Sequence, residues 1–153
     1  MQLKIEGIDF SKTLGPWIGK TYKMLDEYME GILIENNVPI KKQQWLVLNL
    51  IKTNIGINQN ELACFVNRDK TSITRFINNL EKKGYIKREY SAEDKRVKLL
   101  CLTQKGIDTL DFTTPIIKKA ALDLQNEISL DEVKVVIKSL KKIQEKINYL
   151  KNK

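Results

Sequence analysis

The stretch that decides the fold is residues 69–84, which have the sequence DKTSITRFINNLEKKG. At about 100° per residue, a helix over this stretch gathers apolar side chains on one side and polar side chains on the other. Asp69 is placed to cap the start of this helix, and Gly84 to end it in a left-handed conformation. The pattern predicts one face that packs and one that is available for recognition. The packing face has Ile73, Phe76, Ile77 and Leu80, and the polar face has Thr71, Thr74, Arg75 and Asn78.

A shorter helix is predicted just before this one. Asn58 and Glu61 have the spacing of a capping box, in which two side chains satisfy two backbone amides at a helix start. Leu62 and Ala63 follow on one side, and Asn67 tolerates a left-handed turn. Two short helices with about three residues between them are typical of a helix-turn-helix, whose second helix enters the major groove of DNA.

A β-hairpin is predicted directly after Gly84, where the apolar period changes. Residues 86–90 and 97–102 are short runs with a high propensity for β-strand. The polar segment 91–96 joins them and contains neither Pro nor Gly. Two helices followed by such a hairpin predict a winged helix with a charged tip.

Taken together, these segments resemble the MarR family of bacterial winged-helix transcription regulators. The resemblance covers about residues 14–150 and implies a mainly α fold with a small β-hairpin wing. We expect a single domain over residues 1–153, with a winged helix-turn-helix core at 41–102 and dimerisation helices at 10–36 and 104–151. The runs that carry the resemblance are residues 58–63, 71–80, 81–86, 94–96 and 102–106.

Long helices are expected on both sides of the core. Residues 15–36 carry apolar side chains at spacings of three and four, as in a helix buried on more than one side. Residues 41–53 have almost no polar face. Thr103 is placed to cap a helix from 104 towards 126, with Pro115 inside it. The inner side of that helix is expected to carry Ile107, Leu110, Ile117, Ala121 and Leu124.

A final helix is predicted after a second capping box, formed by Ser129 and Glu132. Its apolar stripe runs from Val133 to Leu150. The stripe packs either on the first helix of the same chain or, as the family resemblance implies, on a second subunit. We favour the homodimer, because a helix-turn-helix dimer contacts two half-sites about one helical turn apart.

The net charge of +8 is concentrated in two segments. Residues 68–98 hold ten Lys or Arg against five Asp or Glu, and residues 138–153 hold six Lys against one Glu. The basic winged segment favours double-stranded DNA as a partner, because neutralised phosphates release counterions. For the basic C-terminal segment, a solvated helix face is the better interpretation.

The composition argues against an enzyme. The chain has no histidine, which is the commonest general base and metal ligand. It has no Gly-rich phosphate loop, no paired-cysteine metal spacing and no nucleophile elbow. We therefore expect no catalytic residues, no metal and no cofactor. No run is apolar enough to span a membrane and residues 1–7 do not resemble a signal peptide, so we expect a cytoplasmic protein.

The polar helix face and the hairpin tip are the predicted DNA contacts. Arg75 is the strongest candidate for a bidentate base contact, which discriminates between bases by ~1–3 kcal/mol. By the resemblance, Arg96 is the wing arginine that enters the minor groove, and Asp94 is the acid that orients it. Arg68 and Lys70 are assigned to phosphates. The full predicted set is Arg68, Lys70, Thr71, Ser72, Thr74, Arg75, Asn78, Asp94, Lys95 and Arg96.

The expected function is sequence-specific transcription regulation, as a homodimeric repressor on a palindromic operator. The resemblance implies release from DNA by a small aromatic ligand bound between the dimerisation helices and the winged domain. Two alternatives stay open: a winged-helix module for protein interaction, and a redox sensor that uses Cys64 or Cys101. Both cysteines lie in apolar segments, where a buried thiol is the commoner outcome. The aromatic candidates for the ligand site are Trp17, Tyr22, Tyr28 and Trp45.

Overall fold

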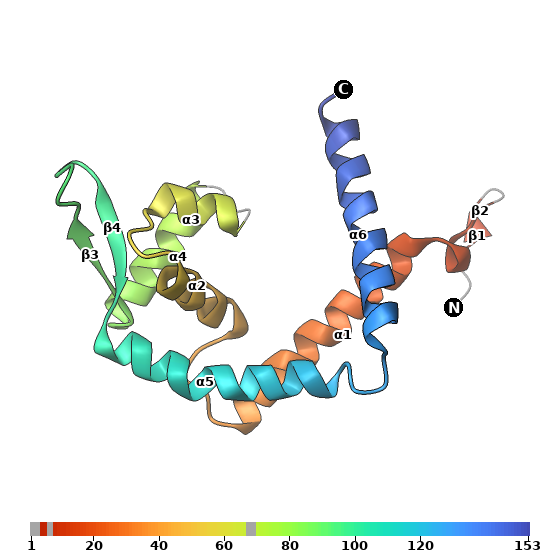
Figure 1. Ribbon diagram of the computed structural model, residues 1–153, viewed down its shortest axis with the longest axis horizontal. Coiled ribbons are helices and arrows are strands. Elements are labelled where there is room, and N and C mark those ends of the chain that lie inside the picture. Colours follow the sequence, from red (N-terminus) through yellow and green to blue (C-terminus); the bar gives the residue numbers. More distant parts are fainter. Residues whose placement is uncertain (1–3, 6–7, 67–69) are drawn as a thin grey trace. The chain divides into compact units, whose positions relative to one another are not determined.

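The computed structural model describes residues 4–5, 8–66 and 70–153, in two compact units, Met1–Ile117 and Lys118–Lys153. The predicted mainly helical fold with a small hairpin wing is confirmed (Figure 1). The single domain over residues 1–153 stays a prediction. The described elements are β1 (Lys4–Ile5), β2 (Ile8–Asp9), the 3-10 helix η1 (Phe10–Lys12), α1 (Leu14–Glu35), α2 (Lys42–Thr53), α3 (Gln59–Phe65), α4 (Lys70–Lys82), β3 (Ile86–Tyr90), β4 (Lys98–Leu102), α5 (Gln104–Asp123) and α6 (Leu130–Lys151).

The hydrophobic core of the first unit joins α2, α3, α4 and the β3–β4 hairpin. Leu48 of α2, Leu62 of α3 and Leu80 of α4 are completely buried, and Leu100 of β4 lies in the same cluster. Fully burying one such side chain stabilises the folded state by ~1.5–3 kcal/mol. The core therefore holds the apolar face of α4 inward, as its periodicity predicts.

Local start and stop signals act as predicted around the two short helices. The Asn58 side chain accepts hydrogen bonds from the backbone N–H groups of Asn60 and Glu61, and Glu61 accepts one from the backbone N–H of Asn58. This is the capping box of α3. Gly84, two residues after α4, has φ +75°, a conformation that favours glycine. The predicted roles of Asn67 and Asp69 lie outside the described residues.

The wing is an antiparallel pair in which Ile86 is opposite Leu102 and Tyr90 is opposite Lys98. The turn between α2 and α3 adds a short third pairing. The backbone N–H of Leu100 donates to the carbonyl oxygen of Ile57 at 2.9 Å, and Asn58 forms a bridge with Leu99. These bonds tie the wing to the start of α3.

Helix α5 begins and continues as predicted, but its inner side differs. The backbone N–H of Gly106 donates to the hydroxyl of Thr103 at 3.1 Å, and the helix runs through Pro115. The prediction that Ala121 and Leu124 face inward is wrong, because both are exposed. The buried positions of α5 follow spacings of three and four instead: Gly106, Thr109, Leu110, Thr113, Ile117 and Ala120.

Two further expectations about burial are wrong for this single chain, namely the buried cysteines and a first helix buried on more than one side. Cys64 is exposed, because its neighbours Leu62 and Ala63 hold the buried positions of α3, and Cys101 is only half-buried. Helix α1 buries only Leu33, and α6 buries none of its residues. Both long helices therefore leave apolar side chains in contact with solvent.

Candidate nucleic-acid interface

Helix α4 separates its side chains into a buried face and a polar face. Ile73, Ile77 and Leu80 are buried, with at most 1% of their surface exposed. Arg75 and Asn78 are exposed, on the other side of the helix. Among the other predicted contacts on α4, Thr71 is exposed, and Ser72 and Thr74 are half-buried. Arg68 and the side chain of Lys70 lie outside the described residues.

Arg88, on β3, links this polar face to the neighbouring elements. Its guanidinium forms an ion pair with the carboxylate of Glu81 and donates to the side-chain oxygen of Asn78 at 2.7 Å. It also donates to the side-chain oxygen of Gln59 at 3.3 Å, and the Gln59 amide donates to the hydroxyl of Thr74 at 2.7 Å. Sequence reasoning missed Arg88, because only the tertiary structure brings α3, α4 and β3 together.

The hairpin tip presents its basic side chains to solvent. Asp94, Lys95 and Arg96 are all exposed. Asp94 accepts a hydrogen bond from the backbone N–H of Arg96 at 2.8 Å, and its own carbonyl oxygen accepts one from the N–H of Val97 at 2.9 Å. Asp94 therefore orders the backbone that carries Arg96. Its carboxylate does so through the main-chain N–H of Arg96.

The outer surface of the wing strands carries a charged pair beside a thiol. Lys87 and Glu89 form an ion pair at 2.6 Å; their hydrogen bond raises the pKa of the Lys87 ammonium and lowers the pKa of the Glu89 carboxyl. The Cys101 thiol lies 3.5 Å from the Glu89 carboxylate. Burial raises the pKa of the Cys101 thiol, with Glu89 adding to the effect. A raised pKa leaves less of the nucleophilic thiolate, so the surroundings of Cys101 do not favour a redox sensor.

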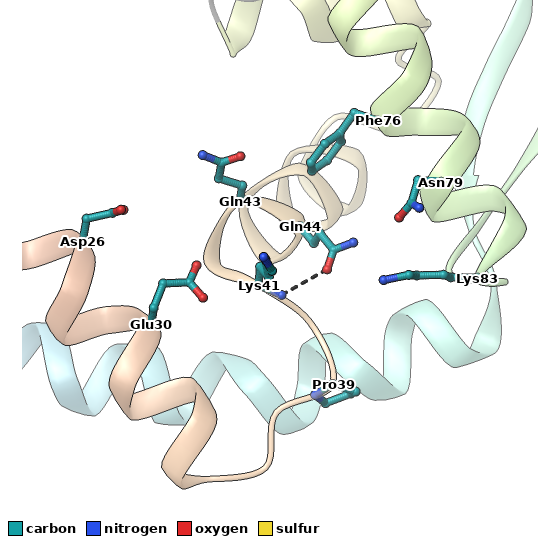
Figure 2. Close-up of a pocket in the computed structure, with 9 residues that line it drawn as sticks. All are labelled: Asp26, Glu30, Pro39, Lys41, Gln43, Gln44, Phe76, Asn79 and Lys83. Carbon is teal, nitrogen blue, oxygen red and sulfur yellow. Dashed lines mark hydrogen bonds between the residues drawn. The ribbon is translucent and has the colours of Figure 1, made fainter.

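A cleft of about 630 Å³ lies beside α4, on the side of the helix that carries Phe76 and Asn79 (Figure 2). Asp26 and Glu30 of α1 form one wall, and Phe76 and Asn79 of α4 form the other, together with Lys83, which directly follows α4. The rest of the lining is Pro39, Lys41, Gln43 and Gln44. The volume is that of a small-molecule site, since such pockets measure ~300–1,000 Å³. A molecule in this cleft would touch the helix that carries the polar face.

The start of α2 holds the acidic wall of this cleft in place. The Lys42 ammonium forms an ion pair with Asp26, and the Lys42 backbone N–H donates to Glu30 at 3.2 Å. The side chain of Gln44 is buried and accepts from the backbone N–H of Lys41 at 3.1 Å (Figure 2). The cleft thus combines one aromatic ring with both acidic and basic side chains.

None of the four aromatic residues predicted for a ligand site lines the cleft. The indole N–H of Trp17 donates to the carbonyl oxygen of Ser11 at 2.9 Å, and that of Trp45 donates to the hydroxyl of Thr114 at 3.2 Å. Tyr22 is exposed and lies beneath the ammonium of Lys42 at 5.7 Å, and Tyr28 is also exposed. Phe76, which the sequence assigned to the packing face, is the aromatic side chain of the cleft.

Within residues 4–5, 8–66 and 70–153, none of the helices combines the length and the apolar character of a membrane span. Nor do these ranges bring three His, Cys, Asp or Glu side chains together as a metal site.

The family model that matches the chain is that of the MarR family, over residues 40–98. Sequence relatives include the uncharacterized HTH-type transcriptional regulator YdgJ of Bacillus subtilis, 26% identical over 77% of this chain and 72% of that protein. The transcriptional repressor MprA of Escherichia coli is 34% identical over 58% of this chain. The chain spans 54% of the length of MprA.

Solved structures with the same fold include complexes with DNA and with a ligand. The S. aureus MepR–DNA complex matches with a TM-score of 0.78 at 23% identity, over 88% of this chain and 98% of that one. CouR from Rhodococcus jostii bound to p-coumaroyl-CoA matches with a TM-score of 0.75 at 21% identity, over 88% of this chain and 93% of that one. At these identities the likeness shows a shared winged-helix fold.

Proposed function

We propose that the protein is a sequence-specific DNA-binding transcription regulator of the MarR family, a repressor rather than an enzyme, since residues 40–98 match the model of that family. The observation that carries the proposal is the polar face of α4. Arg75 and Asn78 are exposed on a helix whose opposite face is buried in the core, and a basic wing tip follows in the same unit. A protein-interaction module would not need this combination of polar and basic groups.

In the proposed complex, α4 enters the major groove, where an arginine recognises guanine through two hydrogen bonds. Arg96 enters the adjacent minor groove, whose negative potential is strongest in A·T-rich DNA. Thr71 and Lys95 contribute contacts to bases or phosphates. The excess of Lys and Arg over residues 68–98 supports this arrangement, because phosphate neutralisation supplies much of the affinity for DNA.

The proposed active form is a homodimer on a palindromic operator. Exposed apolar side chains support it: Trp17, Met24, Val136, Ile147 and Leu150 are each at least 45% exposed in the single chain. Exposed apolar side chains on a helix mark association sites, and two-fold symmetric dimers are the commonest oligomers. A dimer would also supply the two half-sites of a palindrome.

The cleft beside α4 is the proposed effector site. An aromatic ring would pack on Phe76, and Lys41 or Lys83 would pair with an acidic group on the same ligand. Release from DNA requires that the ligand prefer one dimer geometry, since equal affinity for both shifts no population. The CouR structure supports the idea that this fold accommodates an aromatic ligand.

Selection of duplexes from a random-sequence pool tests the proposed function. A sequence-specific dimeric regulator will enrich a palindrome with two equal half-sites. Retained fold with no enriched sequence would refute sequence-specific regulation and favour a protein-interaction module. The enriched duplex then serves as the probe in affinity measurements.

The Arg96→Ala variant is expected to weaken binding to the enriched duplex and to reduce its dependence on salt. Each lost arginine–DNA contact lowers the log–log salt slope by about 1, so a dimer with two wings loses about 2. Titrations at several salt concentrations measure the slope. Lys20→Ala, which removes an exposed cation from α1, is the matched control and should leave the slope unchanged. Equal slopes for wild type and Arg96→Ala would rule out the wing contact.

A charge placed on the apolar stripe of α6 is expected to dissociate the dimer. The Val136→Glu, Ile147→Glu double variant puts two carboxylates where the proposed interface excludes water, and unpaired buried charges are strongly disfavoured. Sedimentation velocity should show a dimer for the wild type and a monomer for this variant. Lys138→Glu on the opposite side of α6 should remain dimeric. A monomeric wild type at micromolar concentration would contradict the proposal.

A further inference from the structure

The chemistry of Arg88 restricts what Asn78 offers to a partner. A guanidinium has five N–H donors and no acceptor, so any atom that it hydrogen-bonds must be an acceptor. The Asn78 atom 2.7 Å from Arg88 is therefore the carbonyl oxygen of the amide. The NH₂ group of Asn78 is then the other branch of the planar amide. The two ends of an asparagine amide are nearly identical in shape, and here the arginine distinguishes them.

The same donor sets the direction of a second chain of hydrogen bonds. Arg88 donates to the oxygen of Gln59, so the Gln59 NH₂ is the group that donates to Thr74 at 2.7 Å. Arg88 is mostly buried, with 22% of its side chain exposed, and Glu81 balances its charge. An arginine placed in this way orients its neighbours, and its pairing with Glu81 makes it a poor phosphate contact.

We propose that Arg88 is a positioning residue that occupies the Asn78 oxygen and so makes the NH₂ group the preferred contact of Asn78 on the polar face of α4. The inference rests on the proposed DNA-binding function and states what one position of each half-site must present. An asparagine free to rotate would contact adenine through both its oxygen and its NH₂. With its oxygen held by Arg88, Asn78 favours base edges that only accept hydrogen bonds.

This polarity predicts a base preference at the position that Asn78 contacts. In the major groove, guanine presents N7 and O6 acceptors and thymine presents O4, whereas cytosine presents the N4 donor. An Asn78 that presents its NH₂ group should therefore favour guanine or thymine over cytosine. The bias against cytosine comes from two N–H donors facing each other with no acceptor between them.

The test compares base preferences across five proteins selected on the same random duplex pool. Asn78→Ala identifies the position, because its preference alone should disappear. The wild type should discriminate against cytosine there by at least tenfold. Asn78→Asp keeps an acceptor for Arg88 but replaces the NH₂ group with an oxygen, and should shift the preference towards cytosine. Because Asn78 is exposed, neither change opens a cavity in the core.

Arg88→Lys supplies the readout that separates positioning from simple stability. Lysine keeps the charge but is a single point donor that lacks the planar fork needed for three acceptors. The Asn78 amide becomes free to rotate, and discrimination at its position should fall at least threefold while the preference set by Arg75 is retained. Lys87→Ala, on the same strand but outside this hydrogen-bond network, is the matched control and should change neither preference.

Two outcomes would overturn the inference. One is an Asn78→Ala variant that keeps every base preference of the wild type. The other is an Arg88→Lys variant that loses affinity equally for all sequences, as expected from a purely structural arginine. If the wild type itself enriches no sequence, the proposed function fails, and this inference fails with it.

Discussion

Arg75→Ala is expected to reduce the affinity of the protein for its enriched duplex at least 30-fold. A good bidentate arginine–guanine contact discriminates by ~1–3 kcal/mol, and a dimer on a palindrome loses two such contacts, about 2–6 kcal/mol in total. Arg75 is exposed on the polar face of α4, opposite Ile73 and Ile77, which are buried. Its removal should therefore cost affinity without costing stability. Fluorescence anisotropy with the enriched duplex and a scrambled duplex measures both specific and non-specific binding.

The Arg75→Lys variant is the matched control for this prediction. It keeps the positive charge but loses the planar pair of donors that matches guanine. Affinity for the scrambled duplex should stay close to that of the wild type, while the ratio of specific to non-specific affinity falls nearly as far as in Arg75→Ala. If Arg75→Lys retains that ratio, Arg75 acts as a charge alone, and base recognition must come from elsewhere.

Gly106→Ala is expected to lower the stability of the fold, although it adds only one methyl group at a buried position of α5. A Cβ atom at Gly106 would lie 2.1 Å from the carbonyl oxygen of Tyr85, a distance that no real Cβ tolerates. That oxygen also accepts the backbone N–H of Thr103 at 3.1 Å, so it cannot move without breaking a bond that joins α5 to the start of the wing. Overpacking of this kind costs ~1–3 kcal/mol or more.

Gly19→Ala provides the contrast, because it makes the same change inside α1 where no atom lies within 4 Å of the added Cβ. Replacing a helical glycine by alanine in open space stabilises by ~0.5–1 kcal/mol. Thermal unfolding followed by circular dichroism should show a lower midpoint for Gly106→Ala and an unchanged or higher one for Gly19→Ala. Equal midpoints would mean that α5 and Tyr85 separate in solution.

The helices, the hairpin and the polar face of α4 could be predicted because their signals are local. The α3 capping box needs only Asn58 and Glu61, three residues apart, and the end of α4 needs only a glycine at Gly84. The spacing of apolar residues in 69–84 predicts which side of the helix is buried, whichever element that side packs on. Exposure of Arg75 and Asn78 follows from that period alone.

Burial could not be predicted where it depends on which element lies opposite. The inner side of α5 turned out to include Ala120 and not Ala121, because packing selects among adjacent apolar positions that periodicity alone does not separate. Cys64 was expected inside and is exposed, since Leu62 and Ala63 already fill the core side of a seven-residue helix. In both α5 and α3, apolar residues lie on more than one side of the helix.

By itself, the sequence determined the order of the elements, the winged-helix fold and the face of α4 that points away from the core. Only the tertiary structure decided that Arg88 contacts Asn78, Glu81 and Gln59, at separations of 10, 7 and 29 residues along the chain. It alone also placed Phe76 in a cleft with Asp26. The physical reason is range: caps, turns and periodicity act within a few residues, whereas a guanidinium is oriented by whichever acceptors the packed core brings within 3 Å or so of it.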